Sequence, residues 1–166
     1  CRRWADRMGV EIERKFLLAN DAWRALGTPV LLRQGYLSAD PQRTVRVRIE
    51  GEQGVLTIKS KSEGASRGEW EYPIPLAEAA ELLERLCERP LVEKTRRRIE
   101  HAGFTWEVDE FLGENAGLVV AEIELPSEDA VFDKPDWIGQ EVTGEKRYYN
   151  SSLIKAPYST WTDTPT

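Results

Sequence analysis

Charged residues alternate with apolar ones in seven short segments of this 166-residue chain, and six of these segments contain two like charges separated by one residue. Successive side chains of a β-strand point to opposite faces, so residues two apart lie side by side on one face. Like charges placed in this way repel each other unless an opposite charge lies between them. Such a face suits the binding of a polyanion together with metal cations. The segments are Glu11-x-Glu13-x-Lys15, Arg46-x-Arg48, Lys59 with Thr57 in phase, Glu69-x-Glu71, Lys94-x-Arg96, Glu107-x-Asp109 and Glu122-x-Glu124.

A plainer interpretation of this alternation is an antiparallel sheet with one solvated face. Such a face usually intersperses Glu with Lys, so that opposite charges pair across strands. Here the acidic and basic residues are instead segregated by strand, and Thr and Ser are scarce among them. The segregation favours a binding surface over a solvated one.

The residue types indicate which ligands this surface would take. Arginine forks match phosphate oxygens and lysines supply point charges, so the basic pairs suit a phosphorylated ligand. Carboxylates without His or Cys suit Mg²⁺ or Mn²⁺ better than Zn²⁺. A linear polyphosphate carried by a divalent cation satisfies both sets of charges.

Period-two alternation predicts about eight strands, at the charged segments and at residues 31–37. We expect a mainly β (α+β) fold, a closed eight-stranded antiparallel β-barrel whose charged face lines a tunnel and whose apolar face is covered outside by a few helices. The clearest helix is predicted over residues 76–88, directly after Pro75. Shorter helical turns are expected after Asn20 or Asp21 and over residues 148–155.

Length and composition favour one domain, which we place at residues 8–156, with residues 1–7 and 157–166 as disordered or vector-derived ends. A net charge of −6 argues against a general nucleic-acid or anionic-membrane surface. Two cysteines form no disulfide framework, and no apolar stretch has the length of a membrane span. We therefore expect a cytoplasmic protein with a small-molecule substrate, and the sequence does not indicate an oligomeric state.

The ordered set of charged segments resembles the CYTH proteins, also called triphosphate tunnel metalloenzymes. The resemblance begins at Glu11-Ile12-Glu13-Arg14-Lys15 and extends from about Val10 to Leu153. Residues 32–37 and 145–148 are most similar to small bacterial members that hydrolyse inorganic triphosphate. The resemblance implies an eight-stranded antiparallel tunnel, dependence on a divalent metal and a substrate that contains a triphosphate.

The resemblance also implies roles for individual residues. One metal ion would be held by Glu13, Glu122 and Glu124, and the remaining acids would hold a second ion or orient the attacking water. Of these remaining acids, we place three among the metal ligands: Glu11, Glu107 and Asp109. We place four among the catalytic groups: Glu11, Glu69, Glu71 and Asp109. Phosphoryl oxygens would be bound by Lys15, Arg46, Arg48, Lys59, Lys94 and Arg96.

Two further roles follow from general chemistry. Lys94 is our candidate for stabilising the leaving phosphate, because the neighbouring Arg96 would lower the pKa of its amine. Tyr36 either hydrogen-bonds a substrate-binding group or packs in the core.

Other activities share the predicted tunnel. An adenylyl cyclase, a thiamine triphosphatase or a nucleoside triphosphatase would need a pocket for the organic group at the tunnel mouth, and the sequence shows no obvious one. A noncatalytic polyphosphate-binding module would be expected to lose its carboxylates and keep its Lys and Arg. All eight acidic positions are present, which favours a metal-dependent inorganic triphosphatase.

Overall fold

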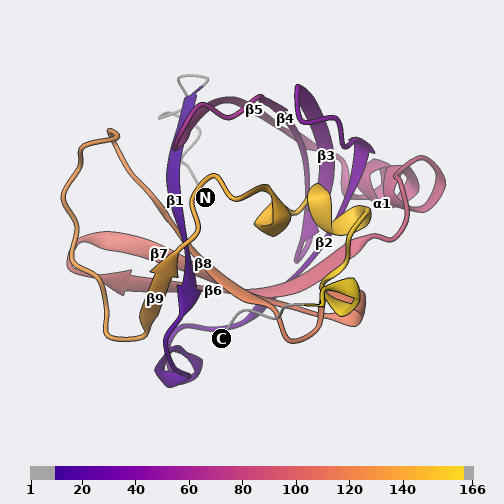
Figure 1. The fold of residues 1–166 in the computed structure, drawn as a ribbon. Coiled ribbons are helices and arrows are strands. Elements are labelled where there is room, and N and C mark those ends of the chain that lie inside the picture. The colour runs from indigo at the N-terminus through magenta and orange to yellow at the C-terminus, as the bar shows by residue number, and fades with distance from the viewer. Residues whose placement is uncertain (1–9, 163–166) are drawn as a thin grey trace.

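The structure is a computed structural model that describes residues 10–162. It contains one nine-stranded antiparallel sheet and, in the described part of the chain, a single α-helix (Figure 1). The strands are β1 (Val10–Leu18), β2 (Val30–Ser38), β3 (Arg43–Glu50), β4 (Gln53–Ser60), β5 (Ser66–Ile74), β6 (Val92–His101), β7 (Phe104–Phe111), β8 (Val119–Glu124) and β9 (Ile138–Glu141), and the helix is α1 (Leu76–Arg85).

Eight of the strands close into a barrel, as the sequence predicts. Their order is β5-β4-β3-β2-β6-β7-β8-β1, and antiparallel pairing of β1 with β5, with Glu11 opposite Arg67, joins the two edges. Closure leaves no free edge between β1 and β5. The strand β9 was not expected; it pairs with β1 outside the ring, with Phe16 opposite Glu141.

Local sequence explains the tight connections of the barrel. The strand β3 alternates Val45, Val47 and Ile49 with Arg46 and Arg48, and pairs with β4 through Val47 opposite Leu56. The turn between them contains Gly51, whose φ of +59° is unstrained only for glycine. Register in this hairpin therefore places every apolar residue of β3 on one face.

The helix α1 covers part of the outer face of the barrel, next to β3 and β4 (Figure 1). Its buried Ala79 and Leu83 pack with Val47 of β3, and Pro75 precedes its first turn as expected. The helix ends at Arg85 rather than at Glu88. On the opposite side, the outer face of β1, β7 and β8 is covered by the 3₁₀ turn Ala22–Ala25 and by the β8–β9 connection, through contacts that centre on Trp106.

Gly35 lets the segment after α1 approach β2. A Cβ atom at this position would lie 2.7 Å from Leu91 Cδ2 and 2.8 Å from Cys87 Cβ, which is too close for carbon atoms. We expect Gly35→Ala to lower the free energy of unfolding by about 1–3 kcal/mol, because the packed neighbours must move. Urea denaturation measures this, with Leu31→Ala as the control: Leu31 lies on the same strand but is half exposed, so its loss is expected to cost less than about 1 kcal/mol. Equal losses in the two variants would contradict this account.

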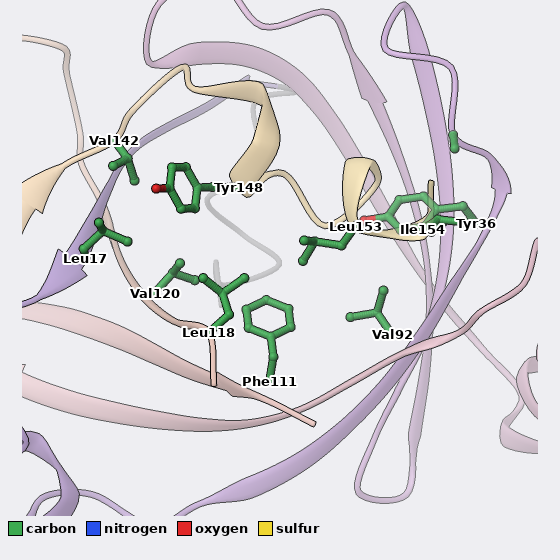
Figure 2. Close-up of a cluster of buried hydrophobic side chains, with 11 residues drawn as sticks. Leu17, Tyr36, Val92, Phe111, Leu118, Val120, Val142, Tyr148, Leu153 and Ile154 are labelled. Atoms are coloured by element: carbon green, nitrogen blue, oxygen red, sulfur yellow. The ribbon is translucent and has the colours of Figure 1, made fainter. Parts of the chain in front are cut away.

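The interior of the barrel is charged at one end and apolar at the other, which refines the expected charged lining. Leu17, Val92, Phe111 and Val120 share the inward phase of the charged residues and form an apolar cluster at one end (Figure 2). The chain after β9 crosses the opening of the barrel (Figure 1) and adds further residues to the cluster, among them Tyr148, Leu153 and Ile154.

The C-terminal segment therefore differs from its prediction. Residues 148–155 form no continuous helix; they contain parts of two 3₁₀ turns, Lys146–Tyr148 and Ser152–Ile154. These turns close the barrel interior instead of covering its outside. The expected disordered end also contains structure, because Tyr158 and Trp161 pack against the apolar cluster and Tyr158 N donates to Asn115 Oδ1 at 2.9 Å. Residues 1–7 and 163–166 lie outside the described residues.

Between residues 10 and 162, no helix combines the length and the hydropathy that a membrane-spanning helix requires.

Candidate active site

The charged end of the barrel interior contains a cavity of about 100 Å³, which is room for several water molecules. Every residue that the sequence predicts for the site lines this cavity, with the exception of Asp109. The lining includes Glu11, Glu13, Lys15, Tyr36, Arg46, Arg48, Lys59, Glu69, Glu71, Lys94, Arg96, Glu107, Glu122 and Glu124. The parity of the strands therefore identifies the inward face correctly.

Strand order sorts these residues into two arcs. The basic arc runs through β4, β3, β2 and β6, and carries Lys59, Arg46, Arg48, Lys94 and Arg96. The acidic arc runs through β7, β8, β1 and β5, and carries Glu107, Asp109, Glu122, Glu124, Glu11, Glu13, Glu69 and Glu71. Two cations, Lys15 and Arg67, lie within the acidic arc.

The basic arc contains buried donors with no acceptor. The Nε atoms of Arg46 and Arg48 are buried, and neither has a hydrogen-bond partner among residues 10–162. Burial, together with the charges of Arg46 and Arg96, lowers the pKa of Arg48 to about 10. Buried unpaired donors and crowded cations both cost free energy, and an anion in the cavity would relieve both costs.

The acidic arc has the opposite problem at Glu13, where buried carboxylates crowd one another. Burial and the nearby carboxylates of Glu11 and Glu122 raise the pKa of Glu13 well above its ordinary value. Burial and a hydrogen bond with Glu11 raise the pKa of Glu69 to about 8. Burial also acts to raise the pKa of Glu11, but Lys59 and hydrogen bonds with Glu13 and Glu69 hold it well below its usual value. Carboxyl groups crowded in this way favour protonation or the approach of a cation.

Internal ion pairs occupy much of the barrel interior. Lys59 Nζ lies 2.9 Å from Glu11 Oε2 and 3.3 Å from Glu69 Oε2, and Lys15 Nζ lies 3.4 Å from Glu122 Oε1. In the described part of the chain, no three His, Cys, Asp or Glu side chains form a ready metal-binding group. The donor set nevertheless suits a divalent cation, because several buried carboxylates line one arc and, at Glu13, burial and the neighbouring carboxylates outweigh the attraction of Lys59.

Asp109 differs from the other predicted residues, because it lies behind the cavity wall and is only 1% exposed. Arg96 donates to both of its oxygens, at 2.7 Å from Nε and 2.8 Å from Nη2, and Lys94 Nζ lies 2.8 Å from Oδ2. Burial would raise the pKa of Asp109, but these cations hold it far below its usual value. With both oxygens held in this way, the carboxylate orients Lys94 and Arg96 and does not face the cavity.

Tyr36 combines the two alternatives left open by the sequence. It is 4% exposed, it belongs to the apolar cluster, and it also lines the cavity. Packing is therefore established for this side chain, and contact with a substrate stays a prediction.

Sequence reasoning missed several residues of the cavity lining. Arg67 is absent from the predicted site residues, although β5 begins at Ser66 and Arg67 continues the phase of Glu69 and Glu71. That shared parity is the signal in the sequence that could have identified it. Tyr149 and Asn150 come from the C-terminal segment, where no strand parity exists to indicate which side chains face the cavity.

The crowded carboxyls predict how the stability of the metal-free protein depends on pH. A raised pKa in the folded state means that Glu69 binds more protons when folded than when unfolded, between its ordinary value of 4.5 and about 8. Stability should therefore fall as the pH rises through this window. The pKa values of Glu11 and Lys94 are instead lowered in the folded state. Their effects on stability have the opposite sign, but they fall outside this window, below pH 4.5 for Glu11 and above about pH 8 for Lys94.

Calorimetry in the presence of a chelator tests this expectation. We expect the Tm of the wild type to fall by several degrees as the pH rises through the window, and Glu69→Gln to reduce this fall. Added Mg²⁺ should raise Tm most at the alkaline end of the window, where the carboxyls lose their protons. A Tm that rises through the same window would contradict the expectation.

Comparisons with known proteins agree with this geometry. The family model described as the CYTH domain matches residues 9–158. An inorganic triphosphatase of Acetivibrio thermocellus is 60% identical over 151 residues, which cover 91% of this chain and 97% of that protein. An inorganic triphosphatase of Nitrosomonas europaea is 41% identical over 147 residues, which cover 86% and 95%. A crystal structure of an inorganic triphosphatase, 38% identical, superposes with a TM-score of 0.62 over 87% of this chain and 97% of that one.

Proposed function

Because this chain belongs to the CYTH family, we propose that it hydrolyses inorganic triphosphate to pyrophosphate and phosphate with the help of Mg²⁺ or Mn²⁺. The similarity to two inorganic triphosphatases over nearly their whole length supports this activity. The proposal is that of an enzyme, not of a binding module, because the carboxylates of the acidic arc accompany the cations of the basic arc.

The observation that carries the proposal is the set of unpaired buried donors in the basic arc. The Nε atoms of Arg46 and Arg48 need acceptors inside a cavity that also contains Lys59 and Lys94. A linear triphosphate offers many phosphoryl oxygens and a high negative charge in a narrow shape. It would satisfy these donors and replace carboxylates such as Glu11 as the partner of Lys59.

Residues of the acidic arc would hold the divalent cation. We assign this role to Glu13, Glu122 and Glu124, with Glu11 and Glu107 as further oxygen donors. When bound, such an ion supplies charge neutralisation at the phosphoryl oxygens and lowers the pKa of water. Its hard oxygen ligands, without His or Cys, are those that Mg²⁺ and Mn²⁺ prefer.

The reaction requires a water molecule in line with the terminal phosphorus and stabilisation of the charge on the departing pyrophosphate. Glu69 and Glu71 line the acidic arc and are our candidates for orienting the water and accepting its proton. Lys94 is our candidate for neutralising the departing group, because burial and Arg96, against the attraction of Asp109, lower the pKa of its amine to about 8. Asp109 would act through Lys94 and Arg96.

A product assay tests the function. Inorganic triphosphate, ATP, thiamine triphosphate and long-chain polyphosphate are each incubated with Mg²⁺ or Mn²⁺, and phosphate, pyrophosphate and cyclic AMP are quantified. We expect the highest kcat/KM for inorganic triphosphate and no turnover with a chelator. Formation of cyclic AMP from ATP, or no turnover of inorganic triphosphate with either metal, would refute the proposal.

A further inference from the structure

The C-terminal segment enters the candidate site and contacts two of its lysines. Tyr148 O accepts a hydrogen bond from Lys15 Nζ at 3.2 Å, and the ring of Tyr149 lies 5.5 Å from the same ammonium group. Asn150 Oδ1 accepts a hydrogen bond from Lys94 Nζ at 2.9 Å. The segment is thus part of the cavity wall as well as a cover for the apolar cluster.

The side chain of Asn150 is itself held in place. Its Oδ1 also accepts a hydrogen bond from Gln34 Nε2 at 2.9 Å, and Gln34 is completely buried on β2. A carbonyl oxygen has two lone pairs, so these two donors satisfy it and fix the amide. Because Gln34 lies in the sheet, the position of Asn150 is tied to the barrel and not only to its own segment.

These contacts leave one direction open at Lys94. An ammonium group has three donors. One points to Asp109 Oδ2 at 2.8 Å and one to Asn150 Oδ1 at 2.9 Å, while the ring of Phe111 lies 5.4 Å from Nζ. The third donor remains for a ligand in the cavity that Lys94 lines.

We propose that Asn150 is a positioning residue that, together with Asp109, directs the third N–H of Lys94 at a phosphoryl oxygen of the substrate. The inference rests on the proposed triphosphatase function. The amide suits this task because it accepts a hydrogen bond without neutralising the ammonium charge. A second carboxylate here would also orient Lys94, but it would repel the triphosphate and compete for the charge of Lys94.

Steady-state kinetics separate positioning from a structural role. We expect Asn150→Leu, which removes the acceptor at similar size, to lower kcat by about 10- to 100-fold with little change in KM, because a misdirected group costs most in the transition state. Asn150→Asp keeps the acceptor, so its kcat should exceed that of Asn150→Leu while its KM rises. Lys155→Ala, at an exposed position of the same segment, serves as the control with unchanged kinetics. Equal kcat in the Leu and Asp variants would overturn the proposal.

A double-mutant cycle tests whether Asn150 acts through Lys94. In a Lys94→Met background, Asn150→Leu should lower kcat by less than about twofold, because the group that it positions is gone. The same 10- to 100-fold loss in both backgrounds would show that Asn150 acts independently of Lys94, and would overturn the proposal.

A measurement without turnover distinguishes this inference from the proposed function. In ¹⁵N-lysine NMR, the Lys94 ammonium signal, assigned by its absence in Lys94→Met, should be protected from exchange in the wild type and lost in Asn150→Leu. An unchanged signal would overturn the positioning role whether or not triphosphate is hydrolysed. If the wild type does not hydrolyse triphosphate but the signal is still lost in Asn150→Leu, the proposed function is refuted and the positioning of Lys94 by Asn150 is supported.

Discussion

Glu13→Gln is expected to lower kcat/KM for triphosphate by at least about 100-fold and, at the same time, to raise the Tm of the metal-free protein. The loss of activity follows from the removal of a charged oxygen donor for the divalent cation, whose charge is worth several kcal/mol in the transition state. The gain in stability follows from the environment of Glu13, because burial and the carboxylates of Glu11 and Glu122 disfavour its ionised form. A neutral amide of the same shape removes that repulsion.

Kinetics over a range of Mg²⁺ and Mn²⁺ concentrations, together with calorimetry in a chelator, measure both effects. The matched control is Glu141→Gln, which changes a carboxylate that lies outside the barrel and pairs with Arg14. We expect that control to leave kcat/KM within about twofold and to lower stability slightly, by at most about 1 kcal/mol. Undiminished metal-dependent turnover in Glu13→Gln would refute its assignment as a ligand, and a lower Tm would refute the account of its repulsion.

Asp109→Leu is expected to act in the opposite direction on stability. Asp109 is the buried partner of Lys94 and Arg96, and its removal leaves two cations inside the barrel without their carboxylate. Breaking one side of a buried ion pair costs about 3–5 kcal/mol. Turnover should fall as well, because both cations lose the group that orients them.

Urea denaturation and kinetics on the purified variant measure these losses. The neighbouring Glu110→Leu is the control, since Glu110 lies on the opposite face of β7 and pairs with Arg24 at the surface. Its substitution should cost at most about 1 kcal/mol and leave the kinetics unchanged. If Asp109→Leu does not fold, Asp109→Asn keeps one acceptor and should show smaller losses of the same sign. Stability of Asp109→Asn at or above that of the wild type would contradict the account.

Glu13 and Asp109 show that an inward position on a strand does not indicate the charge environment of a side chain. Glu13 and Asp109 both lie at inward positions of the barrel, and the sequence places both among the metal ligands. In the structure one is crowded by other carboxylates and the other is enclosed by cations. Their expected effects on stability differ in sign because of their neighbours, which belong to other strands.

The sequence allows the prediction of everything that depends on local periodicity. Alternation identifies the eight barrel strands and the face that each side chain occupies, because side-chain direction in a strand depends on position alone. Fourteen of the fifteen predicted site residues line the cavity, and the fifteenth, Asp109, lies behind its wall. Arg67 would have joined them if its parity with Glu69 and Glu71 had been followed to the start of β5.

The C-terminal segment marks the limit of that reasoning. Residues 142–161 have no strand parity, so their sequence does not indicate which side chains enter the barrel. Tyr148 and Leu153 close the apolar end of the barrel. Asn150 accepts a hydrogen bond from Lys94, which lies 56 positions earlier in the chain. Such contacts depend on the path of the chain across the barrel opening.

By itself, the sequence determined which residues face inward and that the inward face carries separate acidic and basic strands. It could not determine how those strands are arranged, because acidic and basic segments are intermixed along the chain. Only the tertiary structure brings β6 next to β2 and β5 next to β1, and these two long-range pairings gather the cations into one arc and most carboxylates into the other. The physical reason is that side-chain direction is a local property of a strand, whereas the neighbours that set its charge environment come from distant strands.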